Sequence, residues 1–351
     1  MKQLVDRAVY ELLHYPEKTA GGYVKTGIRK LTGRYVAPND KINWPCGLLA
    51  NGLVDYYKNH INSEEAAAIM KALKQYFSRW IKRDCKIYYM DDILSGMALI
   101  ELEQLTKEES YKKALERMLA YLVGHEMDQA GSLPYRPAQK NNHIYADGIG
   151  MICPFLCRYT QVYHDIGANA AAIRQIKNFI AYGMDAKTGL PYHGYEYESG
   201  RKHGIIGWGR AVGWLMLGMV DSLAYMDKEQ PEYDEIKQAF RRLVDKVEMY
   251  QLENGMYAWQ LEAREGAVDT SATAMILLAI AKGLKNEVLI GIHRSRMLRG
   301  RDGLKNYIED GKVKECLAEC QGFSMYPQIY GAYPWSLGPT LSLLTLTEDM
   351  N

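Results

Sequence analysis

The sequence has little of what a membrane or nucleic-acid-binding protein needs. Its 351 residues include 43 Lys and Arg against 42 Asp and Glu, so the formal net charge is +1. This balance lacks the concentrated basic face with which proteins bind nucleic acids or anionic membranes, and we expect neither as a partner. No apolar run approaches the about 20 residues that cross a bilayer. Residues 1–7 lack an apolar signal core and predict an amphipathic helix, so we expect a cytoplasmic protein.

Cysteine and phenylalanine are also scarce, with 6 Cys and 5 Phe against 27 Tyr and 6 Trp. Two cysteine pairs, Cys153/Cys157 and Cys316/Cys320, are spaced to share a helix face. No His or further Cys stands beside them at zinc-ligand spacing, so we predict reduced thiols and no metal site. Tyr and Trp rings with polar tips suit half-buried surfaces that stack on carbohydrate, although proteins that bind no sugar share this composition.

Two kinds of helical pattern alternate along the chain, and no linker rich in Pro, Gly or Ser interrupts them. Amphipathic patterns, typical of surface helices, are expected at residues 2–14, 63–82, 107–123, 168–182, 233–250 and 287–308. Patterns that are apolar nearly all round, typical of buried helices, are expected at residues 44–54, 91–100, 147–159, 208–220, 269–278 and 335–344. We predict a single domain over residues 1–351 with a repeat of roughly 50 to 65 residues.

Six buried helices wrapped by six amphipathic ones define an all-α (α/α)6 barrel. Because the chain alternates strictly between the two layers, the inner helices run parallel and their N-termini meet at one end. These N-termini carry Trp44, Asp91 and Asp92, Asp147, Trp208 with Arg210, Asp269, and Trp335. A mouth with few charges among aromatic rings suits a small polar ligand, and loops 131–145 and 187–207 are expected to wall it.

Asp147 stands at the start of an apolar run within the segment 144–157. An Asp in this place is a good helix N-cap, because its carboxylate accepts the free N–H groups of the first turn. Two carboxylates facing one pocket can instead act as general acid and base, and at about 6.5–9.5 Å apart they suit inverting sugar hydrolysis. Asp91 and Asp92 are candidates for the second acid. Since they are adjacent, we expect one to face the pocket and the other to cap the helix.

Four further side chains near the expected mouth have two interpretations each. His193 lies in a turn-like loop between tyrosines, which suits a structural or a functional histidine. Arg210 interrupts an apolar segment, and a buried guanidinium needs either an internal acid or a ligand carboxylate as its partner. Trp208 and Trp214 flank Arg210 at helical spacing and suit either the core or ligand stacking. Asp269, in an Asp-Thr-Ser sequence, is best explained as a helix cap.

Several short segments form an ordered set. Residues 145–151 read Tyr-Ala-Asp-Gly-Ile-Gly-Met, residues 192–195 read Tyr-His-Gly-Tyr, and residues 208–214 read Trp-Gly-Arg-Ala-Val-Gly-Trp. Residues 254–257, Asn-Gly-Met-Tyr, and 270–275, Thr-Ser-Ala-Thr-Ala-Met, follow. In this order the segments resemble the unsaturated glucuronyl/rhamnogalacturonyl hydrolases of glycoside hydrolase families 88 and 105, with a family 105-like pattern. The resemblance covers roughly residues 40 to 345 and implies the same (α/α)6 fold.

The resemblance implies an enzyme that removes a 4,5-unsaturated uronic acid from the non-reducing end of lyase-generated oligosaccharides by hydrating the double bond. Asp147 would protonate C4 and help water add at C5, with Asp91, or less favourably Asp92, as the second acid. Arg210 would bind the sugar carboxylate. The residues expected to contact the sugar are His193, Arg210, Trp208, Trp214, Trp44, Asp92 and Arg136. The resemblance implies no metal ion or organic cofactor.

Two departures from the family pattern concern the sugar-contacting walls. Arg136 stands roughly where the pectin-fragment branch has a His, and Ala211-Val212 replaces a Gly-Asn pair. These two departures affect the choice of substrate more than the chemistry. Pectin or rhamnogalacturonan fragments are the favoured substrates. The alternatives are an ordinary (α/α)6 glycosidase acting on saturated oligosaccharides, a sugar epimerase, which the scattered histidines disfavour, and a non-catalytic carbohydrate-binding toroid. The sequence is compatible with a monomer or a homodimer.

Overall fold

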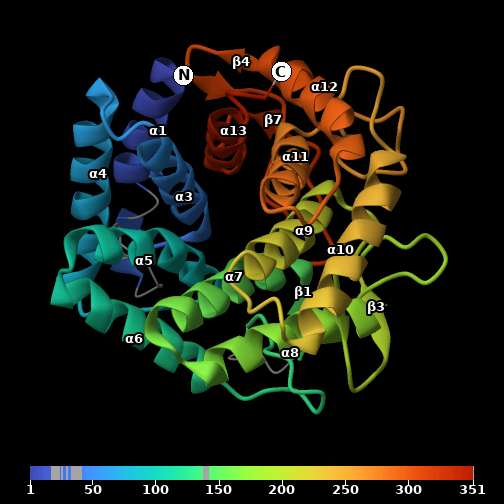
Figure 1. Cartoon of the computed structure of the whole chain (residues 1–351), viewed down its shortest axis with the longest axis horizontal. Coiled ribbons are helices and arrows are strands. Elements are labelled where there is room, and N and C mark those ends of the chain that lie inside the picture. Colours follow the sequence, from blue (N-terminus) through green and yellow to red (C-terminus); the bar gives the residue numbers. More distant parts are fainter. Residues whose placement is uncertain (17–23, 25–26, 29–30, 33–41, 137–141, 351) are drawn as a thin grey trace.

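The computed structural model describes residues 1–16, 24, 27–28, 31–32, 42–136 and 142–350. Within them the chain forms twelve α-helices in two concentric layers, as Figure 1 shows. The inner helices are α3 (Trp44–Asn59), α5 (Ser95–Thr106), α7 (Ala146–Tyr163), α9 (Gly209–Leu223), α11 (Thr270–Lys285) and α13 (Pro334–Leu346). The outer helices are α1 (Lys2–His14), α4 (Glu64–Ile81), α6 (Glu109–Val123), α8 (Ile166–Tyr182), α10 (Pro231–Glu248) and α12 (Arg294–Lys305). The predicted (α/α)6 barrel is confirmed.

The two layers differ in burial as their sequence patterns predict. Every residue of α9 except Asp221 is buried. Helix α10 buries only one face, which carries Tyr233, Ile236, Phe240 and Val244 at spacings of three and four residues. Full burial of a large apolar side chain contributes roughly 1.5–3 kcal/mol, so the inner ring supplies most of the hydrophobic core.

Glycines set the spacing of the inner ring, which closes where α13 packs against α3. A Cβ atom on Gly338 would lie 2.4 Å from the carbonyl oxygen of Leu48, and one on Gly150 would lie 2.6 Å from that of Trp214. Side-chain carbons do not approach backbone oxygen so closely. The small residues of the apolar patterns therefore allow the tight approach of neighbouring helices.

Short strands lie in the loops of the barrel. Strands β1 (His143–Tyr145), β2 (Gly194–Glu196) and β3 (Arg201–His203) form an antiparallel sheet in the order β1-β2-β3. Strand β4 (Ile308–Glu309) pairs with β5 (Lys312–Val313), and β6 (Cys316–Leu317) pairs with β7 (Tyr330–Gly331). Two 3-10 helices, η1 (Met90–Leu94) and η2 (Gly291–His293), precede α5 and α12.

These strands correct one detail of the sequence analysis. Cys316 lies in β6 opposite Gly331, so Cys316 and Cys320 do not share a helix face. All six cysteines are free thiols, as predicted.

No helix of the described ranges has the length and apolar character to cross a bilayer. Of the loop 131–145 that is expected to wall the mouth, residues 137–141 lie outside the described part of the chain.

Candidate active site

A cavity of about 160 Å³ opens where the N-termini of the inner helices converge. Of the nine site residues that the sequence predicts, eight line this cavity: Trp44, Asp91, Arg136, Asp147, His193, Trp208, Arg210 and Trp214. They come from the starts of α3, α7 and α9, from η1, and from the loops before α7 and α9. The parallel arrangement of the inner helices thus gathers residues that are far apart in the sequence.

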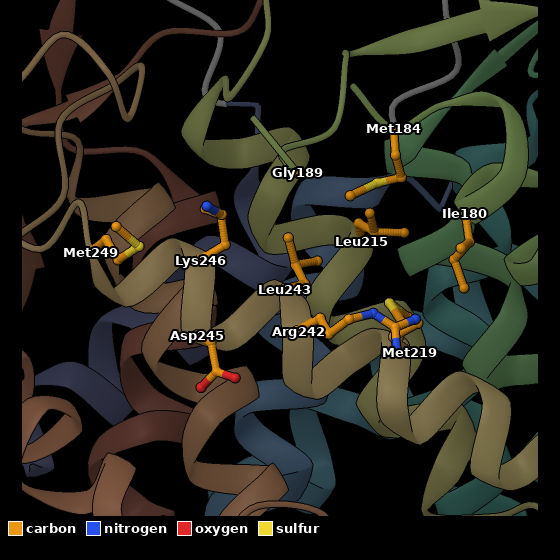
Figure 2. A pocket seen from close by; sticks show the side chains of 11 residues that line it. Ile180, Met184, Gly189, Leu215, Met219, Arg242, Leu243, Asp245, Lys246 and Met249 are labelled. Carbon is orange, nitrogen blue, oxygen red and sulfur yellow. The ribbon is translucent and has the colours of Figure 1, made fainter. Parts of the chain in front are cut away.

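A larger hollow of about 520 Å³ lies on the outer surface between α8 and α10, above α9 (Figure 2). Its lining is mainly Ile, Leu and Met side chains, with the charged groups of Arg242, Asp245 and Lys246 contributed by α10. None of the predicted site residues lies there. The barrel mouth combines acids, a histidine and indoles in one cavity, and we place the candidate active site at the mouth.

Asp147 and His193 form a pair that the small sheet assembles. Antiparallel pairing places Tyr145 opposite Gly194, and the N–H of Ala146 donates to the carbonyl oxygen of His193 at 2.9 Å. This register brings Nε2 of His193 to 3.1 Å from Oδ2 of Asp147. The imidazole is fully buried, whereas the carboxylate keeps 12% of its surface accessible at the cavity. Proton exchange between Asp147 and a ligand is therefore geometrically open.

Asp147 is not the N-cap of its helix. The N-cap position of α7 is Tyr145, and Asp147 is the second residue of the first turn. A carboxylate there is stabilised by the unpaired backbone N–H groups and the positive end of the helix dipole. The capping interpretation of Asp147 is therefore corrected, and the position leaves its side chain directed into the cavity.

Adjacent Asp91 and Asp92 have different surroundings. Oδ2 of Asp92 accepts hydrogen bonds from the backbone N–H groups of Tyr88 at 2.9 Å and Tyr89 at 3.2 Å, and the residue is buried. Asp91 lines the cavity. The carboxylate of Asp92 therefore holds the start of η1, and of the two adjacent acids it is Asp91 that borders the cavity.

The guanidinium of Arg210 is occupied by the protein itself. Nη1 donates to the carbonyl oxygen of Leu317 and Nη2 to that of Ala318, both at 2.8 Å. Nη1 also lies 3.6 Å from Oδ2 of Asp269, and both side chains are almost fully buried. Of the two partners that the sequence left open for Arg210, the structure supplies the internal acid. Both terminal nitrogens of Arg210 thus have partners within the protein, although the residue also borders the cavity.

Asp269 serves as a cap as well as the partner of Arg210. Its Oδ1 accepts hydrogen bonds from the N–H of Ser271 at 2.9 Å, from the Ser271 hydroxyl at 2.6 Å and from the N–H of Leu317 at 3.1 Å. The predicted helix cap is confirmed. In addition, this one carboxylate joins the start of α11 to strand β6, so Arg210 and Asp269 together hold three elements around the mouth.

Three indole rings pack together at the cavity and differ in how deeply they are buried. Trp44 is half-buried and lies 5.0 Å from Trp335 and 6.2 Å from Trp214, measured between ring centroids. Trp214 and Trp335 are buried, and Trp335 donates its indole N–H to the carbonyl oxygen of Leu317 at 2.9 Å. We therefore interpret Trp214 and Trp335 mainly as support for Trp44, whose accessible ring is the better placed of the three to stack on a sugar.

The segment between β6 and β7 supplies site residues that the sequence analysis missed. Glu319, Cys320 and Gly322 line the cavity, and Glu319 Oε1 accepts a hydrogen bond from the Trp44 indole at 3.3 Å. Burial raises the pKa of the Cys320 thiol to about 12, so it is neutral at physiological pH. The available signal was the glycine-containing run 318–325, which lies ahead of the last inner helix, where a loop must cross the mouth.

Two tyrosines, Tyr145 of strand β1 and Tyr135 of the loop before it, also line the cavity without having been predicted. Tyr135 and Tyr145 pack against each other with ring centroids 4.7 Å apart, and Phe323 stacks on the other side of Tyr145 at 4.0 Å. Burial, reinforced by the charge of Asp147, raises the pKa of Tyr145 to about 12. Its hydroxyl therefore remains protonated and is available as a hydrogen-bond donor near Asp147.

Residues 20–348 match the family model described as Glycosyl Hydrolase Family 88. The chain therefore belongs to this family. A possible member of family 105 from Salmonella enterica serovar Paratyphi A superposes with a TM-score of 0.85 at 16% identity, covering 99% of this chain and 93% of that chain. A family 105 glycoside hydrolase from C. acetobutylicum gives a TM-score of 0.79 at 20% identity, covering 95% and 100%.

The fold is shared with unsaturated glucuronyl hydrolases as well. The enzyme from Bacillus sp. GL1, described as responsible for the degradation of glycosaminoglycan, gives a TM-score of 0.69 at 15% identity, covering 99% of this chain and 97% of that chain. The match to the family model confirms the predicted relation to family 88, and the protein is a glycoside hydrolase. The family 105 structures share its fold. Membership counts against the epimerase and the non-catalytic toroid.

Proposed function

We propose that this enzyme hydrates the 4,5 double bond of an unsaturated uronic acid at the non-reducing end of an oligosaccharide, with Asp147 as acid and then base. The observation that carries the proposal is the Asp147–His193 pair, in which Oδ2 is held by the buried imidazole while the carboxylate borders the cavity. Two oxygens in different environments suit a group that must give up a proton and later take one back.

In the proposed reaction, protonated Asp147 gives its proton to C4, where the electrons of the double bond form the new C–H bond. The positive charge that develops at C5 and the ring oxygen is stabilised by the nearby carboxylates of Asp147 and Asp91. A water oxygen then bonds to C5 and its proton passes to Asp147. The resulting hemiketal opens and releases the remaining sugar, so the enzyme returns to its starting protonation state.

Arg136 is the proposed partner of the sugar carboxylate. It is an exposed cation at the cavity wall, and its described contact is with the ring of Tyr89, 5.6 Å from the guanidinium carbon to the centroid. Within the described part of the chain this geometry leaves its N–H groups available, in contrast to the terminal nitrogens of Arg210. A planar guanidinium also matches a carboxylate with two parallel hydrogen bonds.

Replacing Arg136 with Ala is expected to raise KM about 10- to 150-fold with a smaller effect on kcat, because a hydrogen bond to a charged group contributes about 1.5–3 kcal/mol. Initial rates over a range of substrate concentrations measure both constants. Arg136→Lys, which keeps the charge but not the planar fork, is expected to fall between wild type and Arg136→Ala. An unchanged KM in Arg136→Ala would assign the sugar carboxylate to another group.

The charges at the mouth favour a neutral sugar in the next subsite. Among the described residues, three carboxylates, those of Asp91, Asp147 and Glu319, line the cavity together with one exposed cation, Arg136. If Arg136 binds the uronate, a sulfate or second carboxylate on the neighbouring sugar meets negative charge, and like-charge contacts in a binding site are costly. This balance supports rhamnogalacturonan fragments, in which a neutral rhamnose follows the uronate, over polygalacturonate fragments of pectin and over sulfated glycosaminoglycan fragments.

Removing the charge of Glu319 is expected to shift this preference. In Glu319→Gln, kcat/KM for a sulfated unsaturated disaccharide should rise about tenfold relative to that for an unsulfated one, because the repulsion at the wall is lost. The amide keeps an oxygen to accept from the Trp44 indole. Equal changes for both disaccharides would place Glu319 outside the neighbouring subsite.

The function itself is tested with unsaturated disaccharides from pectin, rhamnogalacturonan and glycosaminoglycan, by following the ultraviolet absorbance of the conjugated double bond. Loss of absorbance, with one deuterium appearing at C4 when the reaction runs in D2O, is the expected result. Direct attack at the glycosidic bond would release the unsaturated sugar with its double bond intact, so cleavage would precede the loss of absorbance, which would follow only as the free sugar opens and its enol tautomerises. No change on any of the three, combined with cleavage of saturated oligosaccharides, would favour the ordinary glycosidase.

A further inference from the structure

We infer that Tyr326 is a positioning residue, whose hydroxyl sets the tautomer of His193 and so holds Asp147 ready for proton transfer. The inference rests on the proposed function and adds a residue to it that neither borders the cavity nor appears in the motifs of the sequence. Tyr326 lies in the segment between β6 and β7, which is distant in sequence from both of its partners.

The three side chains form one hydrogen-bonded line. The Tyr326 hydroxyl is 2.8 Å from Nδ1 of His193, and Nε2 of the same ring is 3.1 Å from Oδ2 of Asp147. The backbone N–H of Ile205 approaches the hydroxyl oxygen at 3.4 Å. An N–H can only donate, so it occupies a lone pair of that oxygen and favours donation of the hydroxyl proton to Nδ1.

This direction of donation decides where the imidazole proton lies. A neutral imidazole carries one N–H, and the nitrogen that accepts from Tyr326 cannot also carry it. The proton therefore lies on Nε2, which donates to Asp147. Burial raises the pKa of Tyr326, helped by the nearby Asp147 carboxylate, so the hydroxyl keeps its proton.

The fold provides a specific place for this hydroxyl. Gly204 has φ of +76°, and a Cβ atom there would lie 2.5 Å from the Tyr326 hydroxyl and 2.6 Å from Cβ of His193. Only glycine combines this backbone conformation with the required space. The Tyr326 ring packs against Trp208 with centroids 5.2 Å apart, which fixes the direction of its C–O bond.

The tautomer matters because the two forms present opposite groups to Asp147. With the proton on Nε2, the ring donates to Oδ2 and leaves the other oxygen to carry the proton destined for C4. With the proton on Nδ1, Nε2 offers a lone pair, and protonated Asp147 would donate to the ring instead of to the sugar. Since Tyr326 does not border the cavity, losing its hydroxyl should slow the chemistry without weakening substrate binding.

The test compares Tyr326→Phe with wild type and with Tyr257→Phe. Tyr257 is a buried tyrosine whose hydroxyl has no hydrogen-bond partner in the described part of the chain, so its loss is a matched control. Protein labelled with 15N-histidine reports the tautomer by NMR, and the signal that disappears in His193→Gln belongs to His193. Steady-state rates on an unsaturated disaccharide give kcat and KM.

We expect His193 of wild type and Tyr257→Phe to carry its proton on Nε2, and Tyr326→Phe to shift toward the Nδ1 form. In Tyr326→Phe, kcat should fall about 10- to 100-fold with KM within about twofold of wild type. An unchanged tautomer in Tyr326→Phe, or a changed tautomer with unchanged kcat, overturns the inference. If wild type itself consumes no unsaturated sugar, the proposed function and the catalytic role of Tyr326 both fail, while the NMR result still decides whether the hydroxyl sets the tautomer.

Discussion

Asp147→Asn is expected to lower kcat about 100- to 10,000-fold on an unsaturated disaccharide, the range that a general acid and base supplies. The amide has nearly the same shape, and its oxygen can still accept from Nε2 of His193. It can neither deliver a proton to C4 nor take one from water, so binding should survive while the chemistry stops. Absorbance assays measure the rate, and calorimetric titration of the inactive variant with the disaccharide measures binding.

A suitable control makes the same change at a helix cap outside the cavity. Asp165 accepts from the N–H of Ala168 at the start of α8, and Asp165→Asn keeps an oxygen for that bond. This variant should retain wild-type kcat. If Asp147→Asn were active and Asp91→Asn inactive, the roles of the two acids would have to be exchanged.

Arg210→Ala is expected to lower the free energy of unfolding by about 3–5 kcal/mol, because it leaves the buried carboxylate of Asp269 without its cation. It also removes the donors to the carbonyl oxygens of Leu317 and Ala318 and the cation that lies 4.7 Å from the centroid of Trp208. Chemical denaturation, with the slope compared between variants, measures the loss. Activity should fall with the population of folded enzyme.

A double-mutant cycle with Asp269→Ala separates the pair from its surroundings. If the two side chains stabilise each other, the double variant should lose less stability than the sum of the two single variants. Full stability in Arg210→Ala together with a large rise in KM would restore the role that the sequence suggested, namely binding of the substrate carboxylate. In that case Arg136→Ala would leave KM unchanged.

The helices were predictable because each is determined by local pattern. Residues 2–14 were predicted helical and form α1 (Lys2–His14), and residues 335–344 lie within α13 (Pro334–Leu346). Apolar residues all round a helix require burial on every side, and with amphipathic partners alternating along the chain the two layers follow. The parallel inner helices then placed Asp147, His193 and Trp208 at one mouth, as the cavity lining shows.

The sequence was less informative about which partner a polar side chain binds when several are possible. The sequence could not decide between Asp91 and Asp92, since that choice depends on which carboxylate the backbone N–H groups of Tyr88 and Tyr89 reach. Nor could it show that Arg210 is satisfied internally, because Asp269 and the carbonyl oxygens of β6 are brought to it only by packing. These contacts join residues distant in sequence, and no local pattern records them.

The sequence by itself determined the alternation of helices, the barrel and the family, and it singled out Asp147 as the candidate acid, because periodicity and short motifs are properties of neighbouring residues. Only the tertiary structure decided that Glu319 and Cys320 complete the cavity, that Arg210 lies beside Asp269 and that the Tyr326 hydroxyl contacts His193. The physical reason is the same in each case. A hydrogen bond or an ion pair exists only at distances of a few ångströms, and for these residues the folded barrel alone creates those distances.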